Sequence, residues 1–224
     1  MSVVFTDSFT NSSGSDVRID QWPSAGSPDY AYNGGSGTNL VVSNANDRVE
    51  ASVTSTLLLA RCIDAAGGIT GDQECSATCY QELSQYNESF MRARAASGSQ
   101  DYYALFVERG EILLVRFDAG SGTTLASGAT GLADGARTYT LRATGTNPVA
   151  LTGTISGQTP VTYSDSSASR KSSGVPGFGI FTFDTAKGYV DDFSVDDLAS
   201  GSSAVLFADD MQGGFSRGMT GGMA

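Results

Sequence analysis

Asp191 is an acidic residue that the sequence places among large apolar side chains, and this limits what its carboxylate can do. It lies in a strand-like stretch from Tyr189 to Val195. The two-residue period of a strand places Tyr189, Asp191, Phe193 and Val195 on one face, where the carboxylate would lie among large apolar side chains. A buried carboxylate needs hydrogen-bond donors, a cation or a β-bulge that turns it away. We therefore predict one of these three arrangements at Asp191.

Residues suited to catalysis are scarce in this chain. The sequence contains no histidine, which removes the commonest general base, the serine and cysteine triads and most zinc sites. Glu108 and Glu111 flank Arg109 and Gly110, so we expect a hairpin turn in which Gly110 adopts a positive φ and both acids are solvated. We predict that the protein is not an enzyme.

The three cysteines, Cys62, Cys75 and Cys79, have a C-x12-C-x3-C spacing. A zinc ion would need an acid to complete its tetrahedron, because the chain has neither a fourth cysteine nor a histidine. We expect reduced buried thiols instead, or one disulfide with a leftover cysteine.

Composition limits the partners of the protein. The formal net charge of −11 argues against nucleic acid, whose binding depends on Lys and Arg neutralising phosphates. No run of apolar residues approaches the ~18 that a membrane helix needs, and the N-terminus does not resemble a signal peptide. We therefore expect a soluble protein, made in the cytoplasm, that binds neither nucleic acid nor membranes.

The chain reads as many short strands joined by tight turns. It has 28 glycines and 40% apolar residues among 224, and period-two alternation recurs from residue 90 onward. This pattern predicts an all-β, antiparallel sandwich. Residues 57–88 interrupt the pattern, so we expect an insertion there at one edge of the sandwich, with a short helix over 74–86, because Cys75, Cys79 and Leu83 are spaced by four.

A change in composition after residue 198 predicts a boundary between a domain (1–198) and a tail (199–224). The tail is rich in Gly and Met and cannot bury enough surface to offset its ordering entropy. Two interpretations stay open, a disordered tail and an arm that orders against a partner. Spaced apolar side chains favour partner anchoring by Phe207, Met211 and Phe215.

Four short motifs, in this order, resemble the concanavalin A-like lectin/glucanase superfamily, which includes laminin G-like domains. They are Val3–Phe9 (VVFTDSF) with Trp22 soon after, Asp101–Leu105 (DYYAL), Gly177–Ile180 (GFGI) and Val190–Val195 (VDDFSV). The resemblance implies a two-sheet jelly roll in which the first and last strands lie close together. Domains that open in this way also resemble bacteriophage virion proteins.

The resemblance also suggests site residues. Some members hold a structural calcium through an Asp of the last strand, which corresponds here to Asp191, with Asp7 as its companion. Lectin-like members stack sugars on aromatic side chains, for which Trp22, Tyr30 and Tyr32 are candidates, although a packing role for each is also open. The Glu-x-Asp-x-x-Glu strand of the glucanases is absent from this sequence.

Two functional hypotheses follow from the resemblance. The first is a virion structural protein, most plausibly a capsid decoration protein made in the host cytoplasm, which contacts other virion proteins and assembles as a homo-oligomer. The second is a carbohydrate-binding module or adhesin, for example on a tail fibre.

Overall fold

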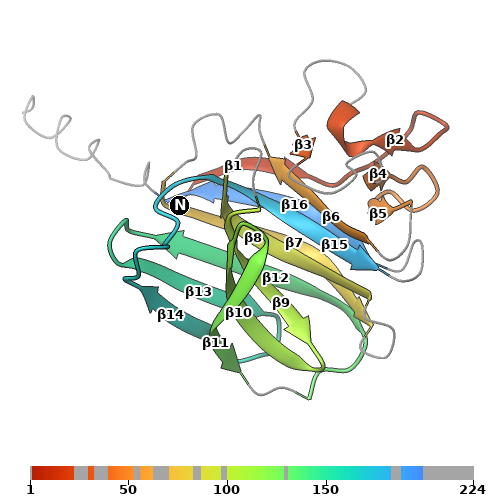
Figure 1. Ribbon diagram of the computed structural model, residues 1–224. Coiled ribbons are helices and arrows are strands. Elements are labelled where there is room, and N and C mark those ends of the chain that lie inside the picture. Colours follow the sequence, from red (N-terminus) through yellow and green to blue (C-terminus); the bar gives the residue numbers. More distant parts are fainter. Residues whose placement is uncertain are drawn as a thin grey trace, which may run out of the picture.

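The strands of this protein form two layers (Figure 1). The computed structural model describes residues 2–22, 30–32, 40–52, 56–62, 71–82, 87–96, 100–128, 131–182 and 188–198. Within them, the 3-10 helix η1 (Ile19–Gln21) is accompanied by β-strands that pair antiparallel. The predicted all-β, antiparallel sandwich is therefore confirmed. Among the described residues, no helix is long and apolar enough to cross a membrane.

Each layer is an antiparallel sheet. Sheet I contains, in spatial order, β14 (Val161–Asp165), β13 (Val149–Ile155), β12 (Gly135–Thr144), β7 (Gln73–Glu82), β16 (Tyr189–Asp197) and β1 (Ser2–Asp7). Sheet II contains β11 (Ser121–Gly128), β10 (Glu111–Asp118), β9 (Tyr102–Glu108), β8 (Asn87–Ala95), β15 (Val175–Thr182), β6 (Thr56–Cys62) and β3 (Tyr30–Tyr32). An extension from the start of β16 adds β5 (Val49–Ala51), β4 (Leu40–Val42) and β2 (Val17–Arg18). The two sheets are joined where the end of β7 pairs with the start of β8.

The main hydrophobic core fills the space between the sheets. Strict alternation of buried and half-buried residues along β7 turns one side of that strand inward, as expected for a strand with one face in a core. Buried side chains from both sheets form one cluster, including Cys75, Tyr139, Leu141, Met91, Tyr103, Leu105 and Phe178. Each large apolar side chain buried here contributes about 1.5–3 kcal/mol to folding.

The helix predicted over residues 74–86 is wrong. Residues 73–82 form β7, which pairs with β12 and β16 near the middle of sheet I, and β6 lies inside sheet II. The described residues of 57–88 therefore belong to the sheets and are not an insertion at an edge. A spacing of four is also twice the period of a strand, so Cys75 and Cys79 share the inward face of β7 without any helix.

The strand face predicted for Asp191 is also wrong, because β16 contains a bulge. The pairing of β16 with β7 shifts register between Asp191 and Ser194, and Asp192 has a φ of 51°. Val190 is buried before the bulge and Phe193 after it, whereas Asp191 is half-buried. Of the three predicted arrangements, the structure contains the bulge that turns the carboxylate away.

The hairpin predicted between β9 and β10 is confirmed, since Glu108 pairs with Glu111 and both Arg109 and Gly110 have positive φ angles of 51° and 83°.

The side chain of Glu50 on β5 is buried. Arg48 Nε donates to Glu50 Oε1 at 2.7 Å, which offsets the cost of burying the carboxylate.

Candidate ligand-binding face

The outer face of sheet II, which points away from the core, carries apolar and aromatic side chains. Outer-face residues of β9 and β10 form pairs in register, Tyr102 with Phe117 and Phe106 with Leu113. A second apolar cluster lies on this face, separate from the core between the sheets, and Phe106 and Phe117 pack against it. The outer face of a sandwich sheet is commonly polar, so this one differs from the usual pattern.

Small residues make this face a hollow rather than a filled layer. Gly179 of β15 lies between Leu59 of β6 and Phe90 of β8 in the strand register. A Cβ at Gly179 would be 2.2 Å from Cζ of the Phe90 ring, so the ring lies across the glycine backbone at a distance no other residue permits. Ala104, between Tyr102 and Phe106 on the outer face of β9, has only a methyl group and so leaves space above the sheet.

Tyr102 is held between two groups at one side of the hollow. Its ring stacks on Phe117 with 4.6 Å between centroids and an interplanar angle of 24°. The guanidinium carbon of Arg92 lies 4.0 Å from the centroid of the Tyr102 ring, and Arg92 Nη1 donates to the Ala60 carbonyl at 3.2 Å. These contacts orient the ring, which is fully buried.

The hydroxyl of Tyr102 makes no hydrogen bond within the described part of the chain. Burial raises the pKa of this hydroxyl, although the charge of Arg92 acts in the opposite direction. A buried hydroxyl without a partner costs about 1–3 kcal/mol. It is therefore a polar group that an added ligand atom can satisfy.

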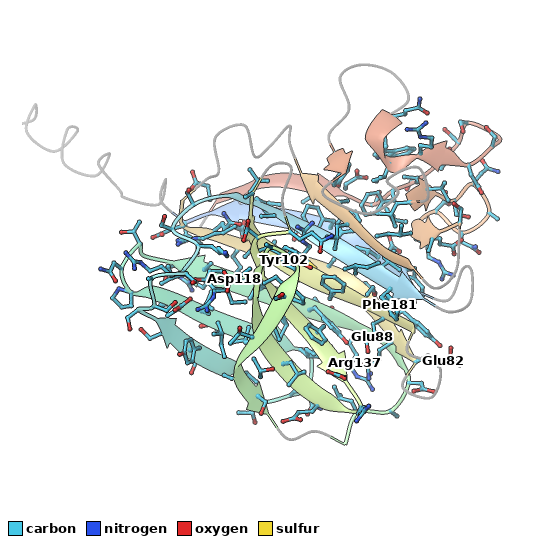
Figure 2. All side chains as sticks on the ribbon, viewed as in Figure 1. Glu82, Glu88, Tyr102, Asp118, Arg137 and Phe181 are labelled. Atoms are coloured by element: carbon cyan, nitrogen blue, oxygen red, sulfur yellow. The ribbon has the colours of Figure 1, made fainter. Side chains whose placement is uncertain are left out.

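The hollow has a volume of about 140 Å³. Its lining is five aromatic residues, one leucine and one carboxylate, namely Phe90, Tyr102, Phe106, Phe117, Phe181, Leu57 and Glu88. Figure 2 labels three of these, Tyr102, Phe181 and Glu88, which come from β9, β15 and β8. Residues from five neighbouring strands therefore build one site.

Glu88 is the one ionisable acid in the lining. Burial, together with the negative charge of Glu108 on the neighbouring strand, raises the pKa of Glu88 to about 7. No hydrogen bond or ion pair joins the Glu88 carboxylate to another described residue. A carboxylate in apolar surroundings without donors is unfavourable, so it can gain from a donor supplied by a ligand.

A second and larger hollow lies between the edge strands β11 and β14. It has a volume of about 380 Å³, and its lining includes Gln158, Thr159, Thr162 and Ser127. This lining contains hydroxyl and amide groups but no aromatic or charged side chain. It lacks the flat apolar surfaces that the first hollow offers for stacking.

The structure brings together three residues that the sequence singled out for two different functions. Trp22 Nε1 donates to Asp7 Oδ2 at 2.8 Å, and the Tyr30 hydroxyl donates to the same oxygen at 3.2 Å. The backbone N–H of Phe9 donates to Asp7 Oδ1 at 2.7 Å. Burial raises the pKa of Asp7, and these three donors act in the opposite direction.

The two oxygens of Asp7 accept three hydrogen bonds, of about four that a carboxylate can accept, and calcium binding there stays a prediction. Asp191 Oδ1 accepts the backbone N–H of Asp192 at 2.8 Å. A hollow of about 280 Å³ next to Asp7 is lined by Asp192 and not by Asp191. Among the described residues, no three acidic, histidine or cysteine side chains are grouped as metal ligands.

The other predicted contact residues are placed as follows. Tyr30 is 1% exposed and packs in the core against Phe9, Phe178 and Phe193, so its ring does not face a sugar. Trp22 is half-buried. The side chain of Tyr32 and the tail residues Phe207, Met211 and Phe215 lie outside the described residues.

Cys75 and Cys79 are free, buried thiols, as one of the two predicted alternatives required. Burial raises the pKa of both, to about 12 for Cys79. Their thiols therefore stay protonated and unreactive at neutral pH. The side chain of Cys62 lies outside the described residues.

Sequence reasoning missed the lining of the aromatic hollow. It named none of Phe90, Phe106 or Glu88 as a binding residue. A usable signal was present, because residues 102–107 are apolar without interruption. Such a run indicates a strand that is buried on both faces.

Comparisons with known proteins support the fold. No family model matches the chain, and no curated protein matches it in sequence. A Bacillus subtilis protein of unknown function with a galectin-like fold aligns with a TM-score of 0.56 and 12% identity, covering 88% of this chain and 96% of that one.

Two further structures are named for their ligands. The carbohydrate binding module CBM66 from Bacillus subtilis aligns with a TM-score of 0.52 and 10% identity, over 73% of this chain and 91% of that chain. The exoplasmic/lumenal domain of VIP36, in its Ca2+/Man2-bound form, aligns with a TM-score of 0.51 and 10% identity, over 81% and 86%. At these identities the likeness shows a shared fold, that of lectin-like jelly rolls.

Proposed function

We propose that the protein binds carbohydrate, and that the aromatic hollow on the outer face of sheet II is the binding site. The observation that carries this proposal is the lining of the hollow, five aromatic residues with a carboxylate and a hydroxyl that lack partners among the described residues. In this proposal the polar groups of the hollow position the ligand, without a catalytic step.

The chemistry of a sugar ring matches this lining. A sugar presents flat patches of C–H groups, which stack on aromatic rings, and hydroxyl groups, which need hydrogen-bond partners. The Glu88 carboxylate can accept from a hydroxyl, and the Tyr102 hydroxyl can either donate or accept. Stacking on the aromatic lining and two polar contacts, at Glu88 and at the buried Tyr102 hydroxyl, would fix the orientation of the sugar.

The comparisons support this proposal at the level of fold. One similar structure is a carbohydrate binding module, and another is a Ca2+/Man2-bound form. They favour the carbohydrate-binding hypothesis over the decoration hypothesis. Calcium is not required by the proposed site, and a calcium-dependent melting shift abolished by Asp191→Ala remains the test of that separate prediction.

The role of a virion structural protein is a separate proposal, which neither the fold nor the aromatic hollow supports. It predicts that the protein co-purifies with a particle. Deletion of residues 205–224 would then abolish incorporation if the tail is the anchor. Unchanged incorporation of the shortened chain would remove the anchoring role of Phe207, Met211 and Phe215.

A glycan array probed with the full chain tests the binding function. Phe106→Ala should lower the affinity for the best glycan at least about tenfold, because one stacked aromatic commonly contributes more than 1 kcal/mol. Tyr163→Ala is the matched control, since Tyr163 is an exposed aromatic on β14 of the other sheet. Thermal melting of both variants checks that they are folded.

The result can contradict the proposal in two ways. If no glycan on the array binds the folded protein, carbohydrate recognition is wrong. If Phe106→Ala and Glu88→Gln both bind a glycan as tightly as the original chain, the binding site lies elsewhere. In that case the hollow between β11 and β14 is the next surface to change.

A further inference from the structure

Three glutamates lie in one row across the outer face of sheet II. Glu108 pairs with Glu111 across the β9–β10 hairpin. The register of β8 with β9, in which Met91 pairs with Leu105, places Glu88 opposite Glu108 when it is continued by three residues. The charge of Glu108 acts on Glu88, which agrees with this placement.

No cation among the described residues neutralises Glu88. Its neighbour on β15 is Phe181, and its neighbour at the end of β7 is Gln81. Arg109, in the turn beside Glu108, is exposed and forms no ion pair with Glu88, Glu108 or Glu111 in the described part of the chain.

The remaining charged or titratable neighbours form no ion pair with Glu88 in the described part of the chain. Arg137, which like Glu88 acts on Tyr139, donates to a backbone carbonyl at 2.9 Å instead. Tyr139 interacts with Glu88 electrostatically, but its hydroxyl donates to Gln81 Oε1 at 2.8 Å. The residues that line the hollow include no Lys or Arg. Arg92 lies four positions along β8, on the face of the Tyr102 ring.

A positively charged donor fits this end of the hollow better than a neutral one. Two adjacent carboxylates repel each other, and a cation between them relieves that repulsion. Aromatic rings attract cations as well, through the negative charge of their faces. A hydrogen bond from an ammonium group to a carboxylate is also roughly twice as strong as a neutral one.

We propose that the hollow selects sugars that carry a free amino group, with the ammonium placed at Glu88 and Glu108 and the ring stacked on the aromatic lining. This proposal rests on the carbohydrate-binding function and specifies the class of sugar. The acidic character of the whole chain, with a net charge of −11, also favours the approach of a cationic ligand.

The test uses matched oligosaccharides at neutral pH, one glucose-based series and one galactose-based series. Each series contains a free amine, the corresponding acetamide and the parent hydroxyl at the same ring carbon, so only the charge and the group at that carbon differ. Titration calorimetry of the full chain should show the free amine binding about tenfold more tightly than the parent hydroxyl in at least one series.

Two variants show whether Glu88 causes this preference. Glu88→Gln keeps the size of the side chain and removes its charge, so the amine and the hydroxyl should bind with similar affinity. Glu111→Gln is the matched control, because Glu111 lies in the same row but is exposed and does not line the hollow. The Glu111→Gln variant should still bind the free amine more tightly than the parent hydroxyl.

The outcomes separate the two proposals. Equal binding of amine, acetamide and hydroxyl sugars leaves carbohydrate binding in place and overturns the amine selection. Retention of the amine preference in Glu88→Gln overturns it as well. Failure of both series to bind overturns it too, whereas the glycan array decides independently whether the protein binds carbohydrate at all.

Discussion

Tyr102 and Tyr103 are consecutive residues of β9, both fully buried, yet they lie in opposite chemical settings. The Tyr103 hydroxyl, on the inner side of sheet II, donates to Asp165 Oδ2 at 2.8 Å and accepts from the Lys171 N–H at 2.9 Å. The Tyr102 hydroxyl, on the outer side, has no partner among the described residues. Within the described residues, the Tyr103 hydroxyl is therefore satisfied and the Tyr102 hydroxyl is not.

The network around Tyr103 extends through several ion pairs. Arg116 Nη1 lies 3.1 Å from Asp165 Oδ2, and its Nε lies 2.9 Å from Asp118 Oδ2. Lys171 Nζ contacts Asp101 at 2.8 Å and Asp118 at 2.6 Å. Burial alone would raise the pKa of Asp118, but hydrogen bonds from Lys171 and Arg116 lower it below its usual value. This network gives the Tyr103 hydroxyl both a donor and an acceptor, which stabilises the fold.

The largest effect is expected from Asp165→Ala, because it removes the centre of this network. Asp165 is 1% exposed and accepts from Tyr103, Arg116 and the Ser167 N–H. Removing it leaves a tyrosine and an arginine without their buried acceptor, so unfolding free energy should fall by about 3 kcal/mol. Urea denaturation measures this loss. Glu111→Ala, at an exposed position, should change stability by less than about 0.5 kcal/mol.

The next effect concerns the packing of the outer face. Gly179→Ala introduces a methyl group into the Phe90 ring, and overpacking of this kind costs about 1–3 kcal/mol. The displaced ring should also weaken glycan binding. Gly131→Ala is the control, since a Cβ there meets no atom within 4 Å. If both variants melt at the same temperature, Phe90 does not require the glycine.

The two tyrosines provide the most direct test of the contrast. Tyr103→Phe removes two hydrogen bonds from buried partners and should cost about 1–2 kcal/mol in unfolding free energy. Tyr102→Phe removes a hydroxyl that has no partner among the described residues and should leave stability unchanged or raise it slightly. Chemical denaturation of both variants compares them, and equal losses would contradict the distinction between the two sides of β9.

The smallest effect is expected from Glu88→Gln and depends on pH. In the unfolded chain a glutamate titrates near ~4.3, whereas the folded pKa of Glu88 is about 7. The folded protein therefore binds this proton more tightly than the unfolded chain. The free energy of unfolding consequently falls as the pH rises from the unfolded pKa through the folded pKa. The variant should be more stable than the original chain at pH ~8, by less than about 1 kcal/mol after solvent screening.

At pH ~3 the original chain and the glutamine variant should have the same melting temperature, since a glutamate with an unfolded pKa near ~4.3 is then protonated in both folded and unfolded states. Differential scanning calorimetry at the two pH values measures the difference. A stabilisation of equal size at both would mean that the carboxylate charge is not its cause.

Sequence reasoning succeeded where a local rule fixes the structure. The hairpin at Arg109 and Gly110 follows from turn chemistry, and the buried thiols of Cys75 and Cys79 follow from the lack of other metal ligands. It failed at residues 74–86, where a spacing of four suits both a helix and a strand. It also failed at Asp191, because a bulge that shifts the face of a strand leaves little trace in the order of residues.

The composition and the two-residue period of this chain determined by themselves that it folds as an antiparallel β-sandwich, since short apolar strands with glycine-rich turns have few other ways to bury their surface. Only the tertiary structure decided where its polar groups find partners. In the part of the chain that the structure describes, Asp7 accepts from three donors and the Glu88 carboxylate from none, although both are acids in β-strands. That difference depends on strand register between distant segments, which local sequence does not encode.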